Sequence, residues 1–359
     1  MFADVYQCRI GILLPVCLAL LILLSTCCAE LAAILCQQLA YCMQYLIPSL
    51  YAGMLICQWM VSAGGLHLLQ RMMSRFGVNG ALLGVYLLSQ IAGYPIGALL
   101  LCKMRSDGQI TGTEAKQYAT VCFGAGPSFP VGLAGAQLLH SPIAGWLLFL
   151  CCLLANAVLA AVMLRKAWCT PTEYIEAPQQ SVVSTLVTSA QHTLESLWQI
   201  TATVLLFGVV CFVCDAVGVT YLLQRLGGCF GVSPVITKAL LYTLCDITNL
   251  PKLCSAGIPY HILLPLLAAC CSFGGICVHC QCLTLGEGCM SLGRLLLTRA
   301  VAALLAALIC SLLLPFFPPP ASMDVFANQP VVSKTGSLLP ALLIFCTGFP
   351  LFSKKDWTN

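Results

Sequence analysis

Long stretches without a charged side chain are the feature that most constrains this chain. Leu31 to Gln70, Gln117 to Leu164 and Leu253 to Gly286 contain none. Shorter uncharged stretches are Ile10–Ala29, Phe76–Cys102, Ser196–Cys214, Ala300–Met323 and Thr335–Ser353. Each is long enough, or nearly so, to cross a hydrocarbon layer of about 30 Å as a helix. The triplet His140-Ser141-Pro142 divides the second long stretch into two helix-length parts.

The composition excludes several classes of protein. Only 8% of the residues are charged and 60% are hydrophobic, whereas a soluble domain carries about 25% charged residues. So few charges cannot cover a soluble surface, and a net charge of +4 is too small for a nucleic-acid partner. We therefore expect an all-α, polytopic integral membrane protein of the cell membrane. It should have about eight transmembrane helices and the lipid bilayer as a partner, and it could be an oligomer.

A polar stretch in mid-chain separates two apolar halves. Arg165 to Glu195 contains Pro171 and Pro178 and has the composition of a linker. The predicted units are a first transmembrane helix (1–40), a first repeat (41–166), a linker (167–195), a second repeat (196–320) and a C-terminal part (321–359). Whether the hydrophobic segment 337–352 spans the membrane is left open.

The N-terminus resembles a signal peptide, because Arg9 precedes an apolar run. No A-x-A cleavage site follows, and Leu24–Cys27 is a poor lipoprotein-type site. The sequence therefore favours an uncleaved first transmembrane helix over cleavage.

The two halves repeat the same motif. Leu68–Arg71 reads L-L-Q-R and is followed by F-G-V at Phe76–Val78. Both motifs recur in the second half with the same spacing, L-L-Q-R at Leu222–Arg225 and F-G-V at Phe230–Val232. Chance similarity between leucine- and glycine-rich helices is the alternative, but the shared spacing favours a duplication.

Helix-breaking motifs interrupt both halves at matched positions. Gly93–Pro95 aligns with Asn249–Pro251, and Cys122–Ala125 aligns with Ser272–Gly275. Such breaks free backbone polar groups, which a membrane tolerates only inside protein or beside a water-filled cavity. One break would be a simple kink, whereas matched breaks indicate a transporter's binding site. Segments 80–102 and 235–252 are thus predicted to be re-entrant hairpins, with spanning helices as the alternative.

The distribution of basic residues favours opposite orientations for the two halves. If segment 80–102 is re-entrant, one face collects many basic residues, as the cytoplasmic side should. These residues are Arg9, Arg71, Arg75, Lys103, Arg105, Lys116, Arg165 and Lys166. The equivalent loop of the second half, between Arg225 and Lys238, would then face outward. The same unit inserted in both directions is an inverted repeat.

These motifs resemble a known family. Ala92–Ala98 (AGYPIGA), Thr113–Lys116 (TEAK) and Cys122–Phe129 (CFGAGPSF) in the first half are similar to sporulation integral membrane proteins of the YlbJ type. Asp246–Asn249 (DITN) and Phe273–Gln281 (FGGICVHCQ) resemble the family's second signature. The resemblance implies two gate-type domains like those of nucleoside and ferrous-iron transporters. It also implies a role in passing dipicolinate in an endospore former, in the forespore or mother-cell membrane.

Two positions depart from the family's pattern. Asp246 and Leu250 stand where the family leads us to expect Glu and Gly. This departure leaves the identity of the substrate open.

The breaks supply the candidate binding residues. Backbone N–H groups at broken helices attract anions, glycines allow close approach, and polar side chains add hydrogen bonds. The predicted substrate-binding residues are Gly93, Tyr94, Pro95, Gly97, Gly124, Gly126, Pro127, Ser128, Thr248, Asn249, Lys252, Ser272, Gly274, Gly275, His279 and Gln281. Lys252 is a possible anion partner or a solvent-facing loop lysine. His279 could face the cavity or bond to a neighbouring carbonyl.

Asp246 is the candidate ion-coupling residue. It is the one acid in the second broken segment, and a carboxylate at membrane depth is a functional candidate by default. Coupling to a cation or proton and a structural ion pair with Lys252 or Lys238 are equally favoured alternatives.

No metal site or cofactor is expected. Cys277, Cys280 and Cys282 accompany His279 within one apolar helix, whereas structural zinc draws separated ligand pairs together. The chain also lacks the P-loop, G-x-S-x-G and H-E-x-x-H motifs, so we do not expect an enzyme. The predicted function is alternating-access transport of a small anionic or heterocyclic metabolite. A non-transporting membrane scaffold for spore-envelope or cortex assembly is the main alternative, and a nucleoside transporter is the second.

Overall fold

The structure is a computed structural model that describes residues 17–317, except 75, 77, 78, 107, 109, 166, 168–181 and 287. Every regular element within these ranges is a helix, which confirms the all-α prediction. The predicted C-terminal part, 321–359, with its hydrophobic segment 337–352, lies outside the described residues, as do residues 1–16 of the predicted first helix.

The first half contains these elements in chain order: a helix over Cys17–Thr26, α2 (Cys28–Tyr41), η1 (Cys42–Leu46), α3 (Ile47–Ser62), α4 (Gly65–Ser74), α5 (Gly80–Ala92), α6 (Ile96–Ser106), α7 (Gly112–Tyr118), η2 (Ser128–Leu138) and α8 (Pro142–Met163). The second half contains α9 (Val182–Ala216), α10 (Val219–Cys229), α11 (Pro234–Cys245), η4 (Ile247–Asn249), α12 (Leu250–Cys254), α13 (Tyr260–Phe273), α14 (Gly275–Leu285), α15 (Leu292–Leu313) and η5 (Leu314–Phe316).

The helices have the lengths and apolar character of membrane spans. Among the described residues, four are long and apolar enough to cross a bilayer: Pro142–Met163, Val183–Ala216, Tyr260–Leu285 and Leu292–Phe316. A fifth span is possible if Cys17–Thr26 and Cys28–Leu46, which meet at 88°, cross as one bent pair. The membrane-like character of the helices is confirmed, and the count of about eight crossings stays a prediction.

The outer surface of α8 is apolar along its whole length. The large exposed side chains recur every three or four residues and form one stripe: Ile143, Trp146, Leu150, Leu154, Val158 and Val162. The polar Asn156 of the same helix is only 1% exposed. Apolar residues outside and a polar residue inside are the arrangement expected of a helix with lipid around it.

The helix α9 extends into the segment predicted as linker. It already begins at Val182, although the sequence placed the linker up to residue 195. Thr185, Ser189 and Thr193 are buried at intervals of four residues, so the small polar residues share one helical face and allow close packing. The last part of the predicted linker, from residue 182 on, is therefore the start of a long packed helix, while Pro171 and Pro178 lie outside the described residues.

The first part of the uncharged Gln117–Leu164 stretch, which ends before His140 and was predicted to be of helix length, does not form one continuous helix. The helix α7 ends at Tyr118, and regular structure resumes only at Ser128 with η2, a π-helical segment of 11 residues. Glycine and proline at Gly124, Gly126 and Pro127 explain the interruption, since neither residue supports helix continuation.

The helices of the two halves begin at equivalent positions. Gly65 and Val219 start α4 and α10, Gly80 and Pro234 start α5 and α11, and Ile96 and Leu250 start α6 and α12, each pair 154 residues apart. Asn79 and Ser233, at matching places, cap α5 and α11 with their side-chain oxygens. The 22-residue helices α8 and α15 close the two halves. This correspondence supports the duplication.

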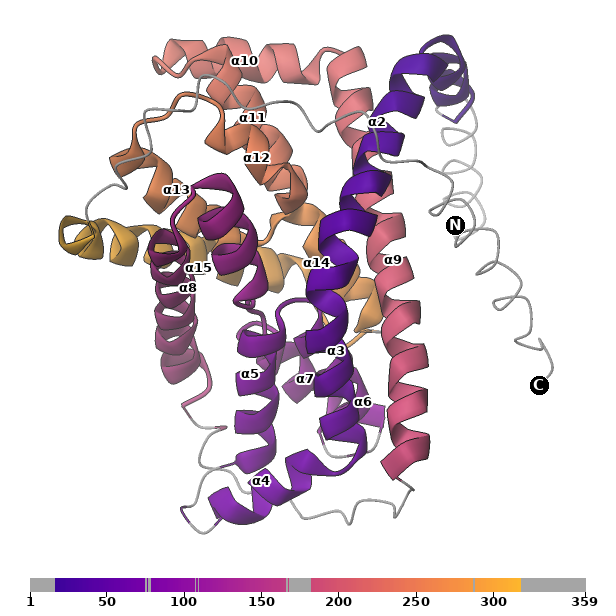
Figure 1. The fold of residues 1–359 in the computed structure, drawn as a ribbon, viewed down its shortest axis with the longest axis vertical. Coiled ribbons are helices and arrows are strands. Elements are labelled where there is room, and N and C mark those ends of the chain that lie inside the picture. The colour runs from indigo at the N-terminus through magenta and orange to yellow at the C-terminus, as the bar shows by residue number, and fades with distance from the viewer. Residues whose placement is uncertain are drawn as a thin grey trace, which may run out of the picture.

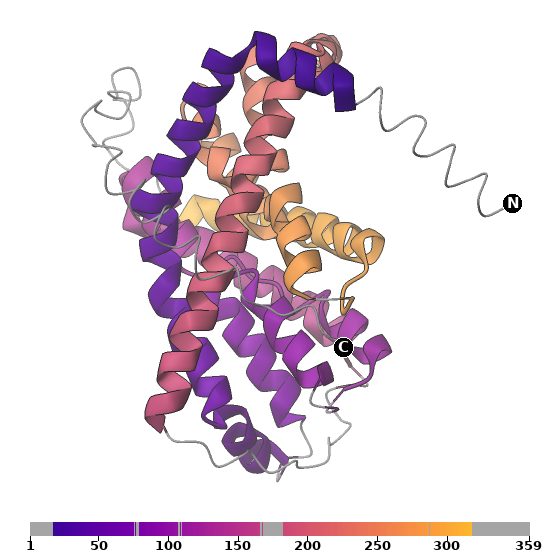
Figure 2. The ribbon, with the colours of Figure 1, turned by 90° about the vertical axis from the view of Figure 1, so that its right-hand side faces the viewer.

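The two units run in opposite directions through the molecule. In Figure 1, α4 lies at the bottom and α10 at the top, and α5 and α11 lead from these ends towards the middle. Figure 2 shows α2 and α9 side by side along the long axis, where they are in contact. The arrangement is that of an inverted repeat, and the end that faces the cytoplasm stays a prediction.

Candidate functional site

The turn between α5 and α6 packs against the interruption between α7 and η2. We call Gly93–Pro95 the first tip and Ala119–Pro127 the first break. The backbone N–H of Tyr94 donates to the carbonyl oxygen of Gly124 at 2.6 Å. A Cβ atom added at Gly126 would come within 2.9 Å of the Gly93 Cα, and one at Gly97 would overlap the Cys122 carbonyl. These glycines thus allow the first tip and the first break to approach each other closely.

The second half repeats this packing. We call Asp246–Asn249 the second tip, which follows α11, and Gly274–Gly275 the second break, which separates α13 from α14. A Cβ atom added at Gly275 would lie 3.0 Å from the Ile247 backbone nitrogen and 3.3 Å from the Thr243 carbonyl oxygen. Each half thus brings one tip and one break into backbone contact.

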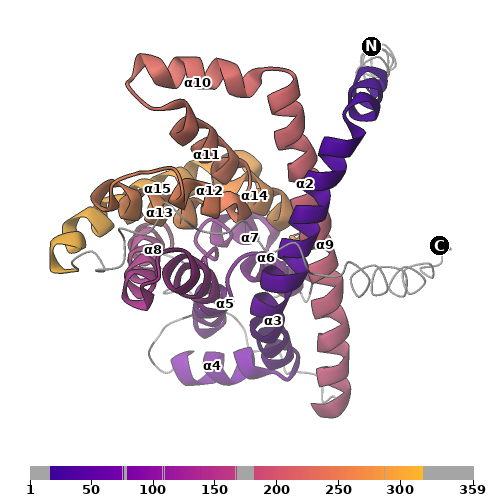
Figure 3. The same cartoon turned by 45° about the horizontal axis from the view of Figure 1, so that its top comes forward.

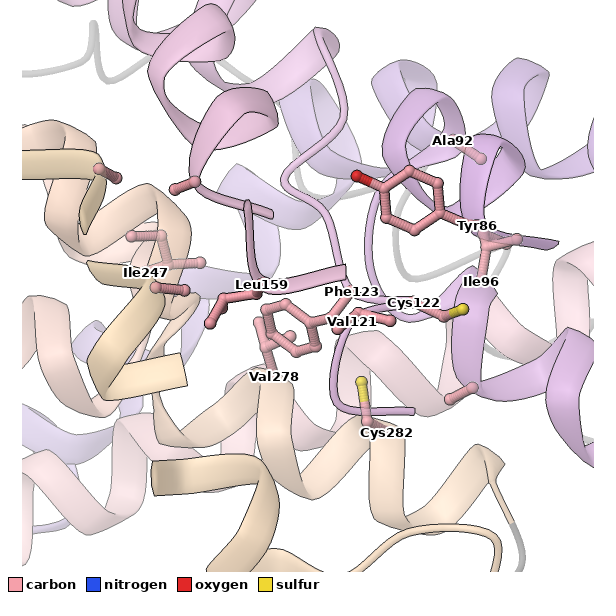
Figure 4. Packing of buried hydrophobic residues seen from close by; sticks show 14 of the residues in the cluster. Tyr86, Ala92, Ile96, Val121, Cys122, Phe123, Leu159, Ile247, Val278 and Cys282 are labelled. Atoms are coloured by element: carbon pink, nitrogen blue, oxygen red, sulfur yellow. The ribbon is translucent and has the colours of Figure 1, made fainter. Parts of the chain in front are cut away.

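The two halves meet at the aromatic ring of Phe123. Its centroid lies 5.0 Å from that of Tyr94 in the first tip and 5.5 Å from that of His279 on α14. A Cβ atom at Gly274 would stand only 2.9 Å from Phe123 Cζ. Figure 4 shows Phe123 in the core cluster that also contains Val278 of α14. Both tips and both breaks therefore converge on one place.

A small cavity of about 40 Å³ opens at this convergence. Five of the predicted site residues line it: Tyr94, Ser128, Asp246, Thr248 and Gln281. Its other walls are mainly apolar and come from Leu46, Leu50, Ala125, Phe129, Ile200, Val204, Ile247 and Val278. The cavity joins polar groups from both halves, as the matched breaks led us to expect, while the binding role of these residues stays a prediction.

Asp246 is the one charged residue among those lining the cavity, and it is 1% exposed. Its carboxylate accepts hydrogen bonds from the backbone N–H of Thr248 at 3.0 Å and from the Thr248 hydroxyl at 2.8 Å. No lysine, arginine or histidine in the described part of the chain forms an ion pair with it. The carboxylate therefore has donors that hold it in place and no ion-pair partner within the described ranges.

The two lysines considered as partners of Asp246 lie elsewhere. Lys238 Nζ is 2.8 Å from a carboxylate oxygen of Asp215, at the end of α9. Lys252 lies over the Tyr242 ring with its Nζ 4.3 Å from the centroid. The ion-pair alternative for Asp246 is thus wrong in this structure, and Lys252 is an exposed residue outside the cavity.

Three further predicted polar residues, Asn249, Ser272 and His279, are buried and do not line the cavity. Asn249 donates to the carbonyl oxygens of Asp246 and Tyr242 at 3.3 and 3.5 Å. The Ser272 hydroxyl is buried and has no hydrogen-bond partner in the part of the chain that the structure describes. His279 places Nδ1 2.6 Å from the Gly275 carbonyl oxygen, while its buried Nε2 has no partner among those same residues. Of the two alternatives for His279, facing the cavity or bonding to a neighbouring carbonyl, the structure has the second.

The sequence reasoning missed Arg299, which is fully buried on α15. Its guanidinium donates to the Asn156 side-chain oxygen at 2.7 Å, the Thr120 carbonyl at 2.7 Å and the Phe123 carbonyl at 3.2 Å. It also lies 5.0 Å from the Phe123 ring centroid. Arg299 therefore holds the first break from a helix of the second half. A charge within a 22-residue apolar helix was the available signal.

Asn156 continues this network into the first hairpin. Its amide nitrogen donates to the Phe123 carbonyl at 2.7 Å and to Gln90 Oε1 at 2.9 Å. Gln90 in turn donates to Ser89 at 3.1 Å. The backbone oxygens that the first break exposes are thus satisfied by protein, as membrane depth requires.

The described residues contain no group of three or more His, Cys, Asp or Glu side chains placed to hold a metal ion. Comparisons of the chain with models of protein families, with curated proteins and with solved structures find no match. The resemblance to the YlbJ-type sporulation proteins therefore stays a prediction.

Proposed function

We propose that this protein is a secondary transporter that moves a small metabolite across a membrane by alternating access. The observation that carries the proposal is the cavity where the tips and breaks of both halves meet. Tyr94 and Ser128 of the first half line it together with Asp246, Thr248 and Gln281 of the second. Ligand sites of transporters built from inverted repeats lie at such junctions of broken helices.

If the protein is a transporter, the volume of the cavity indicates which conformational state the structure represents. About 40 Å³ is room for a few water molecules and not for an organic metabolite. The structure then corresponds to a closed state, and substrate entry requires a tip to separate from its break. The glycine contacts at Gly93, Gly126 and Gly275 are the packed surfaces that would part.

The charges of the side chains that line the cavity limit the class of substrate that it could bind. The cavity offers a carboxylate, two hydroxyl side chains, a phenol and an amide, and no basic side chain lines it. This set favours an uncharged heterocyclic metabolite. An anion such as dipicolinate, which the family resemblance implies for a sporulating host, would need Asp246 to carry a proton or a cation when the anion binds. Asp246 is accordingly the proposed coupling residue.

A non-transporting scaffold for spore-envelope or cortex assembly is the second candidate. The tight backbone packing at the breaks and the small cavity favour it, since a scaffold needs no route for a solute. A nucleoside transporter is a further version of the transport proposal, because nucleosides are uncharged heterocyclic compounds.

Uptake into proteoliposomes tests these proposals. Labelled dipicolinate and a labelled nucleoside would be offered separately, with and without a proton or sodium gradient, and each would compete with the other. Transport predicts saturable uptake of one of them that empty liposomes lack. Absence of uptake and of exchange for both solutes, with a folded and correctly inserted protein, would favour the scaffold.

A further inference from the structure

The short helix α10 presents an unpartnered apolar stripe. Leu222 and Leu226, which lie four residues apart on one side of the helix, are 59% and 51% exposed, and Phe230, directly after the last residue of α10, is 85% exposed. The opposite side packs on α11, where Gly227 lies against Thr237 and Thr220 is buried. Figure 3 shows α10 at the edge of the molecule.

The position of α10 along the chain places it at the border of the membrane. The uncharged part of α9 runs from Ser196 to Cys214, which is about 28 Å of helix and matches the hydrocarbon layer. Asp215 ends this stretch, Gly218 turns the chain with a φ of 85°, and α10 follows at once. In Figure 1, α10 lies across the end of α9. Its apolar stripe is therefore at the depth where amphipathic helices lie in the interface.

A groove of about 510 Å³ lies on α10 next to the stripe, because two of its lining residues, Arg225 and Cys229, follow Leu222 and Leu226 by three residues and are their neighbours on the helix surface. Tyr221, Gln224, Arg225, Gly228, Cys229 and Pro234 line it, from α10 and the start of α11. Arg225 Nε donates to the Tyr221 hydroxyl at 2.8 Å, which fixes the guanidinium at the groove. Its two terminal nitrogens have no hydrogen-bond partner among the described residues. Gln224 donates to the Pro234 carbonyl at 3.1 Å and ties the two sides of the groove together.

We propose that this groove binds the phosphate group of an anionic phospholipid, whose acyl chains cover the stripe of α10. Two free guanidinium nitrogens can bond two phosphate oxygens at once, which is the geometry that arginine favours. The stripe supplies the apolar contact, and its place beside the groove matches a molecule with an anionic head and apolar tails. The site is separate from the central cavity and does not depend on the transport proposal.

Native mass spectrometry of the detergent-solubilised full-length protein, titrated with phosphatidylglycerol or phosphatidylcholine, tests this site. Wild-type protein should bind phosphatidylglycerol more tightly than phosphatidylcholine. Arg225→Gln should raise the Kd for phosphatidylglycerol about tenfold, because a charge-assisted double hydrogen bond is lost. Tyr221→Phe should raise it less, because it only frees the guanidinium to move. Arg294→Gln, at an equally exposed arginine of α15, should leave the Kd unchanged.

Two further arms distinguish the source of the phosphate and the role of the stripe. Leu226→Asn should weaken phosphatidylglycerol binding, and inorganic phosphate at equal concentration should not displace the lipid. An unchanged Kd in both Arg225→Gln and Tyr221→Phe would overturn the proposal. Equal binding of the two lipids, displacement by inorganic phosphate, or an unchanged Kd in Leu226→Asn would also overturn it.

Discussion

Arg299 on α15 donates from Nη1 to the side-chain oxygen of Asn156 on α8 at 2.7 Å. These helices close the two halves of the chain, so the contact joins equivalent elements through residues that are not themselves equivalent. Since no carboxylate forms an ion pair with Arg299 among the described residues, its charge is compensated by oxygen dipoles of Asn156 and of the first break. The unwound segment of one half thus depends on a side chain of the other.

Replacing Arg299 should destabilise the protein strongly. Arg299→Leu would leave the Asn156 side-chain oxygen and the Thr120 carbonyl without their donor, and each buried unsatisfied group costs about 1–3 kcal/mol. We expect a total loss on the order of 3 kcal/mol, seen as a lower Tm of the detergent-solubilised protein. Arg294→Leu, at an exposed arginine of the same helix, is the matched control and should change the Tm little. Equal melting of the two variants would show that the network is not stabilising.

Alanine substitutions at Gly274 and Gly218 separate the effect of the contact with Phe123 from the effect of backbone strain. Gly274 has a φ of 84° and Gly218 a φ of 85°, but a Cβ atom would meet Phe123 Cζ at 2.9 Å at the first and nothing within 4 Å at the second. Alanine at either position costs about 1–3 kcal/mol of strain. We expect Gly274→Ala to lower the Tm further than Gly218→Ala and to reduce uptake, whereas Gly218→Ala should keep uptake. Identical effects of the two substitutions on the Tm and on uptake would mean that the contact with Phe123 contributes to neither stability nor transport.

The parts of the fold that the sequence predicted correctly are those set by local chemistry. The all-α character follows from the uncharged stretches. The break at Phe273–Gly275 and the convergence of both halves follow from glycine and proline in apolar surroundings and from the repeated L-L-Q-R motif. Five residues singled out at these breaks line the cavity: Tyr94, Ser128, Asp246, Thr248 and Gln281. The helix α3 also lies within the uncharged Leu31–Gln70 stretch, which was predicted to be helical.

The features of the site and fold that could not be predicted from the sequence depend on which helices pack together. In the sequence, Arg299 directly precedes the uncharged Ala300–Met323 stretch, and only the packing of α15 on α8 makes it a buried donor to the first break. The proximity of Lys252 to Asp246 in sequence suggested an ion pair, but Lys252 lies instead over the Tyr242 ring. The predicted linker extended to residue 195 because the small polar residues on the packed face of α9 resemble those of a loop in sequence.

The inverted arrangement predicts that α4 and α10 face opposite sides of the membrane. Cys229 on α10 and Met72 on α4 are both exposed. In an otherwise cysteine-free protein in cells, an impermeant thiol reagent should label Cys229 from outside. A Met72→Cys variant that lacks Cys229 should be labelled only after permeabilisation. Labelling of both from the same side would contradict the arrangement.

The stabilities of Lys238 and Asp246 variants should be independent of each other. Lys238 pairs with Asp215, and both side chains are about a third or more exposed, so Lys238→Met should cost about 1 kcal/mol or less. In a double-mutant cycle measured by Tm, Lys238→Met should show coupling with Asp215→Asn. It should show none with Asp246→Asn, and rescue of the latter would restore the ion-pair interpretation.

The most direct test of the central claim is gradient-driven accumulation by the wild-type protein and by Asp246→Asn in the same proteoliposomes. If the junction cavity is a transport site coupled through Asp246, the wild type accumulates its solute against a gradient. Asp246→Asn should lose accumulation while it keeps solute exchange, because the amide carries no charge but can still bond to Thr248: its oxygen can accept from the Thr248 N–H, and its NH2 group can donate to the Thr248 hydroxyl oxygen. Undiminished accumulation in a stable Asp246→Asn protein would contradict the account.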